Sequence, residues 1–464
     1  LKMAQTARER GVEPAALADE MSSHFKAMDD RLQISYDRFI RTTEAAHHKA
    51  SQAIWQAMVE NGDVYLGRYE GWYSVRDEAY YDEKELIVAQ SGERLSPQGT
   101  LVEWTVEESW FFRLSKYEEP LLRHYEADPG FIRPESRRNE VIRFVEGGLS
   151  DLSISRTSFD WGVKVPGNEN HVMYVWVDAL TNYLTGVGYP DESASRYWPA
   201  DVHIIGKDII RFHAVYWPAF LMSAGLPLPR QVFGHGFLLH RGEKMSKSLG
   251  NVVDPHELAD AFGVDQLRYF LLREVTFGQD GSYSAEAIVN RVNADLANSF
   301  GNLAQRTLSF IAKNCGGVLP QSASEHAADR TLLTLVAELT RTEMPAHFEN
   351  LALSQGIEAW LRGVFACNQF IDAQAPWVLR KTDPDRMMTV LGTLYEAIRD
   401  LAIAILPIIP GSAGRLLDQM GISKDERTIA ALADPQSYGR LASSGFRLDL
   451  PKPIFPRLDM PSVS

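Results

Sequence analysis

The spacing of apolar residues changes along the chain and separates regions with different predicted structures. Between Pro14 and Glu60, apolar positions recur at helical intervals and glycine and proline are almost absent, so mainly helices are predicted. From Val64 to about Val163, short aromatic-rich runs are broken by glycine and proline. That pattern predicts a mixed, partly β region.

Denser apolar runs follow at His171–Val177 and Asp201–Gly206. Runs of this kind are typical of strands that are buried on both faces of a parallel sheet. Each run leads into a helical segment, as in the βα units of an α/β fold.

The remainder of the chain has mostly helical periodicity. After a turn and a polar loop, a helix is predicted to begin at Asp254, which can cap it, with Pro255 at the first position and Glu257 as a capping-box partner. From about Ser284 to Leu417 the pattern predicts a bundle of roughly five helices. Its breaks are expected at Asn314–Pro320, Ala375-Pro376 and Pro410-Gly411.

The composition is that of an ordinary folded protein, with 45% apolar and 23% charged residues among 464. This length exceeds what one hydrophobic core usually supports, so about two to four domains are expected. Even the apolar stretch Leu401–Pro410 is too short to span a membrane. We therefore expect no membrane association and interpret this stretch as a buried helix end.

Charge and cysteine content narrow the possibilities further. The net charge of -14 argues against a surface covered with phosphate-binding groups, although a local basic face is compatible with it. Cys315 and Cys367 are the only cysteines, which argues against disulfides and favours a reducing cytoplasm. The first residue is Leu1 and the segment to Glu9 is too polar for a secretory signal, so we expect the chain to begin inside a domain.

A lysine-rich loop carries the most specific chemistry. Lys244-Met245-Ser246-Lys247-Ser248 precedes Leu249-Gly250-Asn251 and lies between a predicted strand and the capped helix. Two ammonium groups on a loop of small polar residues can approach a triphosphate, and they can stabilise the charge that develops in a transition state. An arbitrary Lys/Ser loop would more often be a solvated surface loop.

In this order and place, the five residues resemble the signature loop of class I aminoacyl-tRNA synthetases. Further segments are similar to those of methionyl-tRNA synthetases, namely Tyr174–Tyr183, His203–His213 with Tyr216–Ala219, Gly148–Arg156, Tyr36–Thr43 and Ala375–Trp377. The resemblance implies an α/β fold: a Rossmann-type parallel-sheet catalytic domain with a mixed α/β insertion, followed by an α-helical bundle that binds the anticodon.

It also implies a division of the chain. The expected parts are the remainder of the first half of the Rossmann catalytic domain (1–58), a connective-peptide insertion (59–168), the second half of the catalytic domain (169–236), a lysine-loop stem-contact region (237–283) and a helical anticodon-binding domain (284–464).

The activity implied is ATP-dependent attachment of L-methionine to tRNA(Met) through methionyl-adenylate, with release of AMP and pyrophosphate. The methionine carboxylate would attack the α-phosphorus in line while Mg²⁺ and the lysine loop neutralise the departing pyrophosphate. The catalytic residues would be Lys244, Ser246 and Lys247. Residues expected to bind ATP are Gly206, Lys207, Asp208, His235 and Lys247. From their positions alone, Asp208 could equally be a helix cap and His235 a structural residue.

The methionine pocket would be lined by Trp176, Ala179, Leu180, Tyr183, Ile209 and His213. Aromatic rings contact a thioether favourably, by about 0.3 to 1.5 kcal/mol each. By resemblance, Tyr183 and His213 supply the polar partner of the sulfur, which would disfavour aliphatic analogues. Without the motif, Trp176 and Tyr183 would more simply be core aromatics on a sheet.

An RNA-binding trio is expected in the helical part of the chain. Asn302 and Arg306 share one helix face, and Trp377 follows a helix-ending proline. Hydrogen-bonding groups beside an aromatic plane suit unpaired bases, and the resemblance assigns these three residues to the CAU anticodon. Otherwise, Asn302 and Arg306 would be solvated surface groups and Trp377 a packing anchor.

The sequence departs from the family at two places. Ser74 and Asp77 stand where many relatives have the first Cys-x-x-Cys of a zinc knuckle, so we expect no structural zinc and an insertion held by aromatic packing. The family's His-x-Gly-His string, which serves the ATP phosphates, does not occur in this sequence. We therefore expect this polypeptide alone to be inactive.

Two other functions are each compatible with only part of these features. A synthetase for leucine, isoleucine or valine usually carries a large editing insertion, for which residues 64–163 leave little room. A non-catalytic tRNA-binding paralogue would have no reason to keep both the lysine loop and the Trp176 pocket. A monomer is favoured because no appended dimerisation module follows Leu458-Asp459-Met460.

Overall fold

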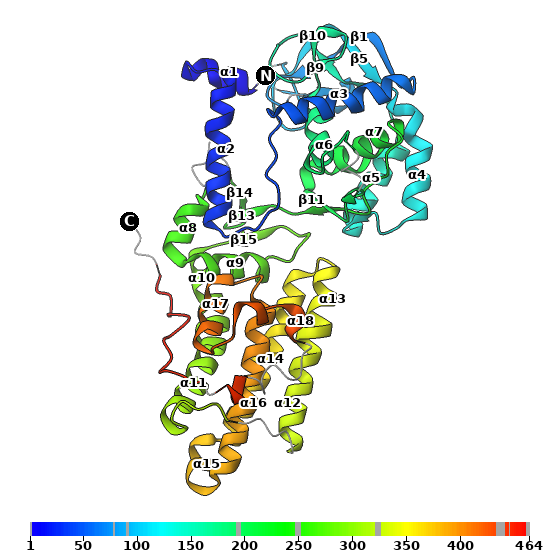
Figure 1. The fold of residues 1–464 in the computed structure, drawn as a ribbon. Coiled ribbons are helices and arrows are strands. Elements are labelled where there is room, and N and C mark those ends of the chain that lie inside the picture. The colour runs from blue at the N-terminus through cyan, green and yellow to red at the C-terminus, as the bar shows by residue number, and fades with distance from the viewer. Residues whose placement is uncertain are drawn as a thin grey trace. The chain divides into compact units, whose positions relative to one another are not determined.

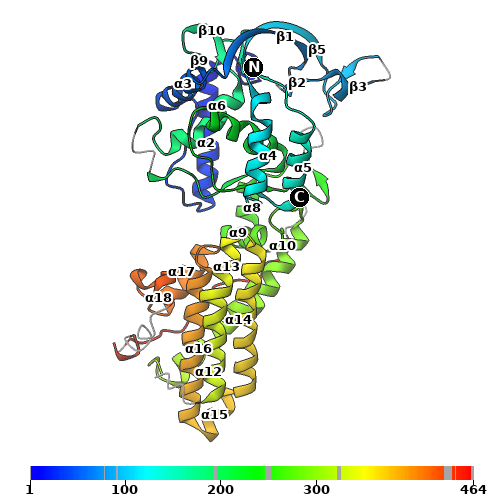
Figure 2. The ribbon, with the colours of Figure 1, turned by 90° about the vertical axis from the view of Figure 1, so that its right-hand side faces the viewer.

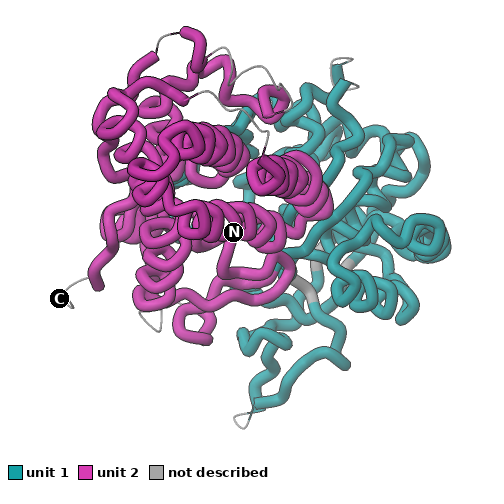
Figure 3. The backbone as a smooth tube through the Cα atoms, turned by 90° about the horizontal axis from the view of Figure 1, so that it is seen from below, with its two compact units in different colours: residues 1–29, 35–235 teal, residues 30–34, 236–464 magenta. Residues whose placement is uncertain are grey.

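The computed structural model describes residues 2–77, 79–89, 92–191, 196–245, 252–320, 326–432, 441–444 and 446–460. Its backbone forms two compact units (Figure 3). Unit 1 comprises residues 1–29 and 35–235, and unit 2 comprises residues 30–34 and 236–464. None of the described helices is both long enough and apolar enough to cross a membrane.

A short parallel sheet lies at the centre of unit 1. Its strand order is β11 (His203–Gly206), β12 (Val232–His235) and β6 (Ile132–Arg133), and both pairings are parallel. The predicted strand at Asp201–Gly206 is therefore confirmed, although Ile204 is 50% exposed. The fold class expected from the sequence, a parallel-sheet domain followed by helices, is confirmed as well.

The prediction for His171–Val177 was wrong in part. Strand β10 (Asn168–Met173) pairs antiparallel with β8 (Ser155–Arg156) and β9 (Lys164–Val165), and helix α6 (Val175–Gly186) begins two residues after it. A dense apolar run does not by itself distinguish a buried strand from a buried helix. Here the run contains the end of one and the start of the other.

Helices surround this sheet in unit 1 (Figure 1). They are α3 (Ala45–Glu60), α4 (Glu118–Ala127), α5 (Glu135–Glu146), α6, the 3₁₀ helix η4 (Lys207–Ile209), the π-helix η5 (Phe212–Tyr216) and α7 (Trp217–Ser223). Their apolar faces meet in one core, to which Trp55, Phe131 and Trp217 contribute large side chains that are 2% exposed or less. The first helices of the chain are α1 (Lys2–Arg10) and α2 (Pro14–Arg31).

The aromatic-rich region forms an antiparallel sheet, which confirms its predicted β character. Strands β1 (Val64–Ser74) and β5 (Glu103–Phe112) pair from Val64 opposite Phe112 to Tyr73 opposite Glu103. β2 (Ala79–Tyr81) extends one edge and β7 (Leu152–Ser153) the other. A small ladder joins β3 (Ile87–Val88) to β4 (Arg94–Leu95).

Unit 2 begins with a small sheet and two short helices. The strand order is β14 (Glu243–Lys244), β13 (Leu238–His240) and β15 (Gly281–Tyr283). Helix α8 (Pro255–Phe262) starts where the sequence predicted, because the Asp254 carboxylate accepts a hydrogen bond from the His256 backbone N–H at 2.8 Å. Helix α9 (Val264–Arg273) follows it.

The rest of unit 2 is a helical bundle in which α12 (Ala327–Glu338), α14 (Leu353–Gln374) and α16 (Pro384–Ile405) run side by side (Figure 2). Helix α16 is buried along most of its length; its buried residues are mainly apolar and include the ion pair of Arg399 with Asp400. The other helical segments are α10 (Ala285–Val292), η7 (Asn293–Gly301), α11 (Asn302–Asn314), η8 (Leu339–Glu343), α13 (Met344–Glu349), α15 (Pro376–Thr382), α17 (Pro410–Gln419), η9 (Lys424–Glu426) and α18 (Ile429–Leu432). The predicted breaks after Asn314, at Pro376 and at Pro410 coincide with helix boundaries.

Candidate functional site

One face of α6 carries the side chains expected to bind methionine. Trp176, Ala179, Leu180 and Tyr183 share this face because their spacing matches the helical repeat. The Trp176 ring stacks on Phe212 of η5, with centroids 3.8 Å apart and planes at 9°. Leu180 is buried, whereas Trp176 and Tyr183 are only partly buried, so the two rings are not fully enclosed by the core.

A hydrogen-bonded pair fixes the polar part of this pocket. The Tyr183 hydroxyl lies 2.7 Å from His213 Nε2, and His213 Nδ1 lies 3.0 Å from the Ile209 carbonyl oxygen. Because a carbonyl only accepts, Nδ1 must carry the hydrogen, and Nε2 of the neutral ring then accepts from Tyr183. His213 thus links Ile209 to Tyr183 and Trp176 in one cluster.

Burial keeps the pocket uncharged. It lowers the pKa of His213, although the contact with the Ile209 carbonyl acts in the opposite direction. It raises the pKa of Tyr183 to about 12. The pocket therefore presents neutral aromatic and imidazole rings, which suit an uncharged thioether side chain.

His203 packs against Tyr183, a role that was not predicted from the sequence. Its ring lies 3.9 Å from that of Tyr183, centroid to centroid, and its Nε2 accepts a hydrogen bond from Trp217 Nε1 at 3.3 Å. Burial, helped by the neighbouring His213, lowers the pKa of His203 to about 3. The sequence feature that could have indicated this role is the position of His203 in the motif segment that also contains His213.

The residues expected to bind ATP lie at the carboxyl ends of two neighbouring parallel strands. Gly206 ends β11 and pairs in register with His235, which ends β12. Such strand ends are the usual ligand-binding edge of an open α/β sheet. Lys207 and Asp208 follow in η4, whose N-cap is Gly206, so Asp208 lies inside that helix and not at its cap.

A side chain at Gly206 would displace the Asp208 carboxylate. A Cβ atom there would lie 2.6 Å from the Asp208 Oδ1 atom, so the exposed Asp208 side chain lies back over the strand end. Gly236, which follows His235, is restricted more strictly, because a Cβ would meet the Gln279 backbone oxygen at 2.2 Å.

The lysine loop is only partly described. Lys244 is exposed at the end of β14, and its Nζ atom lies 4.8 Å from the centre of the Phe237 ring. Ser246 and Lys247 lie outside the described residues. The catalytic roles expected for Ser246 and Lys247, and the binding of ATP by Lys247, therefore stay predictions.

In unit 2 the structure brings Arg306 and Trp377 together. The Arg306 guanidinium lies 5.4 Å from the centre of the Trp377 ring and donates a hydrogen bond to Asp372 at 2.8 Å. Trp377 is 43% exposed, so it is not a buried packing anchor. Asn302, one turn before Arg306, lines a cavity of about 410 Å³ together with Ala297, Asn298, Gly301, Gln305 and Pro453–Phe455.

Three hydroxyl groups surround the carboxylate of Asp77, one of the two residues that stand where many relatives have the first Cys-x-x-Cys of a zinc knuckle. Asp77 Oδ2 accepts hydrogen bonds from Ser96 at 2.6 Å, Thr100 at 2.5 Å and Tyr81 at 3.0 Å, and Ser74 bonds Thr100 at 2.6 Å. Burial alone would raise the pKa of Asp77, but these hydrogen bonds lower it below the ordinary value. In the described part of the chain, no group of three or more His, Cys, Asp or Glu residues could hold a metal ion.

The aromatic packing expected in this insertion is present beside that polar cluster. The Trp72 and Trp104 rings meet edge to face with centroids 5.3 Å apart, and the Arg94 guanidinium lies 4.4 Å from the centre of the Trp72 ring. The expectation of aromatic packing alone was incomplete, because the hydroxyl cluster also joins β1 to the loop that precedes β5. The positions of Ser96 and Thr100 relative to Ser74 and Asp77 depend on the fold and were not predictable from spacing.

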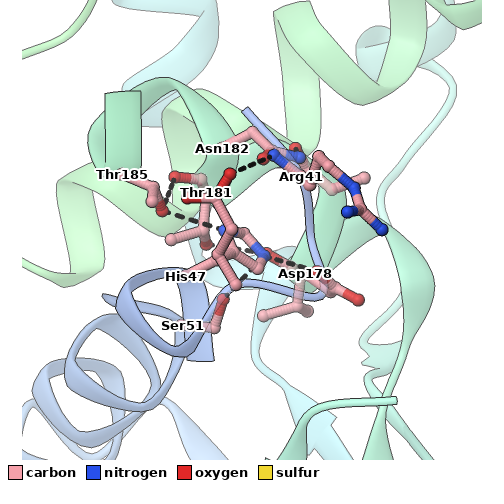
Figure 4. Close-up of polar contacts among 10 residues, drawn as sticks. Arg41, His47, Ser51, Asp178, Thr181, Asn182 and Thr185 are labelled. Atoms are coloured by element: carbon pink, nitrogen blue, oxygen red, sulfur yellow. Dashed lines mark hydrogen bonds and ion pairs between the residues drawn. The ribbon is translucent and has the colours of Figure 1, made fainter. Parts of the chain in front are cut away.

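A second buried network was also missed from the sequence. His47 of α3 contacts Asp178 and Thr185 of α6, with Ser51 beside it (Figure 4). His47 Nε2 lies 2.6 Å from Asp178 Oδ1, and Nδ1 lies 2.9 Å from Thr185 Oγ1. His47 is 0% exposed.

Comparison with known families gives two matches that together cover most of the chain. Residues 1–308 match the model described as tRNA synthetases class I (M), and residues 319–459 match the anticodon binding domain of methionyl tRNA ligase. The methionine–tRNA ligase of Brucella suis biovar 1 (strain 1330) is 58% identical over 460 residues, covering 98% of this chain and 88% of the relative. That of Mycobacterium tuberculosis (strain H37Rv) is 55% identical over 470 residues, covering 99% and 89%.

A solved structure is also similar. It is the Mycobacterium tuberculosis methionyl-tRNA synthetase in complex with methionyl-adenylate, with a TM-score of 0.93 and 54% sequence identity. The match covers 98% of this chain and 90% of that chain.

Proposed function

This chain belongs to the class I methionyl-tRNA synthetases, and we propose that it attaches L-methionine to tRNA(Met) with ATP, through methionyl-adenylate, releasing AMP and pyrophosphate. The observation that carries this proposal is the neutral pocket of Trp176, Tyr183 and His213 beside the carboxyl end of β11. A pocket with these contacts suits a flexible thioether, and its position suits an adjacent nucleotide.

In this proposal the methionine side chain contacts Trp176, Ala179, Leu180, Tyr183, Ile209 and His213. An aliphatic analogue of the same length gains the aromatic contacts but lacks the sulfur acceptor. Both hydrogens of the Tyr183–His213 pair are already donated, to His213 Nε2 and to the Ile209 carbonyl, so discrimination against the analogue requires the Tyr183 hydroxyl to turn from His213 to the sulfur when methionine binds.

ATP, as its Mg²⁺ complex, would lie along the strand ends at Gly206, Lys207, Asp208 and His235. The carboxylate of methionine attacks the α-phosphorus, the bond to the β-phosphate oxygen breaks, and pyrophosphate leaves with its negative charge. Lys244 and Lys247 would neutralise that charge and the Ser246 hydroxyl would donate a hydrogen bond to it, roles supported by the sequence of their loop. A ribose hydroxyl of the tRNA 3′ end then attacks the adenylate carbonyl, and AMP leaves.

The anticodon of tRNA(Met) would bind at Asn302, Arg306 and Trp377. The exposed Trp377 ring and the Arg306 guanidinium beside it are available to stack on and hydrogen-bond with unpaired bases. The domain limits given above, a monomeric state and a cytoplasmic location are part of the same proposal.

The activation step tests the role of the lysine loop. In a version of the chain that is extended at its amino end with the family's His-x-Gly-His segment, we expect Lys247→Ala to lower the rate of ATP–pyrophosphate exchange by about 100-fold, the usual scale for one donor to a developing charge. Lys424→Ala, at an exposed lysine of unit 2, is the matched control and should leave the rate unchanged. Equal rates for the extended version with and without Lys247→Ala would contradict the proposal.

We propose further that the 464-residue polypeptide alone does not form methionyl-adenylate, because its sequence contains no His-x-Gly-His string. The test compares ATP–pyrophosphate exchange by this chain with that of an amino-extended version, in which the family segment carrying the string precedes Leu1. Exchange should appear only in the extended version. Full exchange by the chain itself would disprove this part of the proposal and leave the methionine pocket unaffected.

A further inference from the structure

Helix α6 has two functional faces. Trp176, Ala179, Leu180 and Tyr183 lie on the face that forms the proposed methionine pocket. At 3.6 residues per turn, Asp178 and Thr185 lie on the opposite face, nearly half a turn away from Trp176 and Tyr183. Because both faces belong to one helix, contacts that hold Asp178 and Thr185 in place also set the orientation of the face that carries Trp176 and Tyr183.

What holds that face is a buried histidine from another helix. His47 lies in the first turn of α3 and is 0% exposed, and its two ring nitrogens contact Asp178 and Thr185. These two residues are two helical turns apart, so one imidazole links the start of α6 to its end (Figure 4). The Asp178 carboxylate only accepts, so Nε2 of His47 must donate to it.

Neighbouring hydroxyls complete the network. The Ser51 hydroxyl lies 3.2 Å from His47 Nε2, and the Thr185 hydroxyl lies 3.1 Å from the Thr181 carbonyl oxygen. Because Asp178 is 16% exposed at its side chain and His47 is fully enclosed, little water is available to replace either partner. Few alternative arrangements of α3 against α6 would satisfy all of these groups.

We propose that His47 is a positioning residue for methionine, because with Asp178 and Thr185 it fixes the rotation of α6 about its axis and hence the positions of Trp176 and Tyr183. This inference rests on the proposed methionine pocket. It states that three residues outside the pocket set the positions of its side chains. Side chains extend about 5 to 6 Å from a helix axis, so a rotation of about 10° moves a ring by about 1 Å. Displacements of that size are enough to impair a binding or catalytic arrangement.

The test measures methionine and ATP separately. In the amino-extended version, we expect His47→Ala to raise the KM for methionine at least tenfold in ATP–pyrophosphate exchange, with the KM for ATP within twofold. The preference for methionine over norleucine should fall at the same time, because Tyr183 is no longer held against His213. Asp178→Asn should have a smaller effect in the same direction, and the two substitutions should not be additive.

A matched control separates positioning from general stability. Tyr117→Phe removes a buried hydroxyl that donates to Asp63 at 2.5 Å in the same unit, far along the chain from α6. It should lower the melting temperature, yet the KM for methionine should stay within twofold. If His47→Ala and Tyr117→Phe change the methionine KM alike, the histidine has only a structural role and the inference fails.

Conservative variants give a second readout. His47→Gln can place an N–H near the Nε2 position and should bring the methionine KM part of the way back to that of the parent, whereas His47→Asn, which reaches only the Nδ1 position, should bring it back less. If His47→Ala does not fold, Thr185→Val removes the hydroxyl that contacts His47 and the Thr181 carbonyl with little change of shape, and it should still raise the methionine KM about threefold. An unchanged KM in folded His47→Ala or Thr185→Val would overturn the inference, whereas the absence of methionine activation in the unsubstituted extended version would instead overturn the proposed function.

Discussion

The pocket around Tyr183 and the surface around Trp377 both combine an aromatic ring with a nitrogen-bearing side chain, but they differ in burial and charge. His213 is 3% exposed and paired with a neutral hydroxyl, whereas Arg306 is 34% exposed at its side chain and paired with a carboxylate. The first arrangement suits a small uncharged group that is withdrawn from water. The second suits the unpaired bases of an RNA, because its cation faces solvent and RNA phosphates are negatively charged.

Two independent recognition steps are expected, and both are measured in the amino-extended version. A substitution in the proposed methionine pocket should change methionine activation and leave the affinity for tRNA intact, and a substitution at the proposed anticodon surface should do the reverse.

Trp176→Ala should have the largest effect. It removes the ring that stacks on Phe212 and that is proposed to contact methionine, and loss of such an aromatic anchor costs about 3 kcal/mol, or about 100-fold in affinity. The KM for methionine in ATP–pyrophosphate exchange measures it. Trp104→Ala, at a 53% exposed ring in β5, is the control and should change the methionine KM by less than twofold.

Trp377→Ala should affect only the RNA. Loss of one stacking surface costs about 1 to 3 kcal/mol per base, so the KM for tRNA(Met) in aminoacylation should rise about tenfold or more. The rate of ATP–pyrophosphate exchange without tRNA should not change. A fall in that exchange rate would show that the two sites are not independent.

Tyr183→Phe should have a smaller but more selective effect. It leaves His213 Nε2 without its hydroxyl partner, at a cost of about 1 to 3 kcal/mol shared between stability and binding. We expect the ratio of methionine to norleucine activation to fall severalfold while norleucine itself is activated nearly as before. An unchanged ratio would mean that the hydroxyl does not contribute to selecting the sulfur.

Asp77→Asn should leave both recognition steps unchanged and reduce only stability. The pKa of Asp77 is lower in the folded chain than its usual value of 3.8, so its stabilising effect is complete above that value and is lost as the pH falls through the folded-state pKa. The melting temperature of the variant should therefore lie below that of the parent at neutral pH, and the difference should shrink below about pH 4. A difference that is constant with pH would contradict this account of the hydroxyl cluster.

Sequence reasoning predicted the parts that depend on local pattern. The cap at Asp254 and the helix boundary at Pro376 both follow from short-range rules, and the structure has them where they were expected. The motif segments also identified side chains that the fold brings together, such as Tyr183 and His213, which are 30 residues apart.

The parts that were missed depend on long-range contacts. His47 and Asp178 are 131 residues apart, and nothing in either local sequence indicates that they meet. The same is true of Ser96 and Thr100 around Asp77. At His171–Val177 the error had a different cause, because an apolar run has the same composition whether it forms a strand end or a helix start.

The side chains of Tyr183, His203 and His213 keep one protonation state near neutral pH. With the pKa of His213 lowered, that of Tyr183 at about 12 and that of His203 at about 3, the trio neither takes up nor releases a proton near neutral pH. If methionine binds at this cluster as proposed, its selection should therefore be as faithful under mildly alkaline conditions as at pH 7.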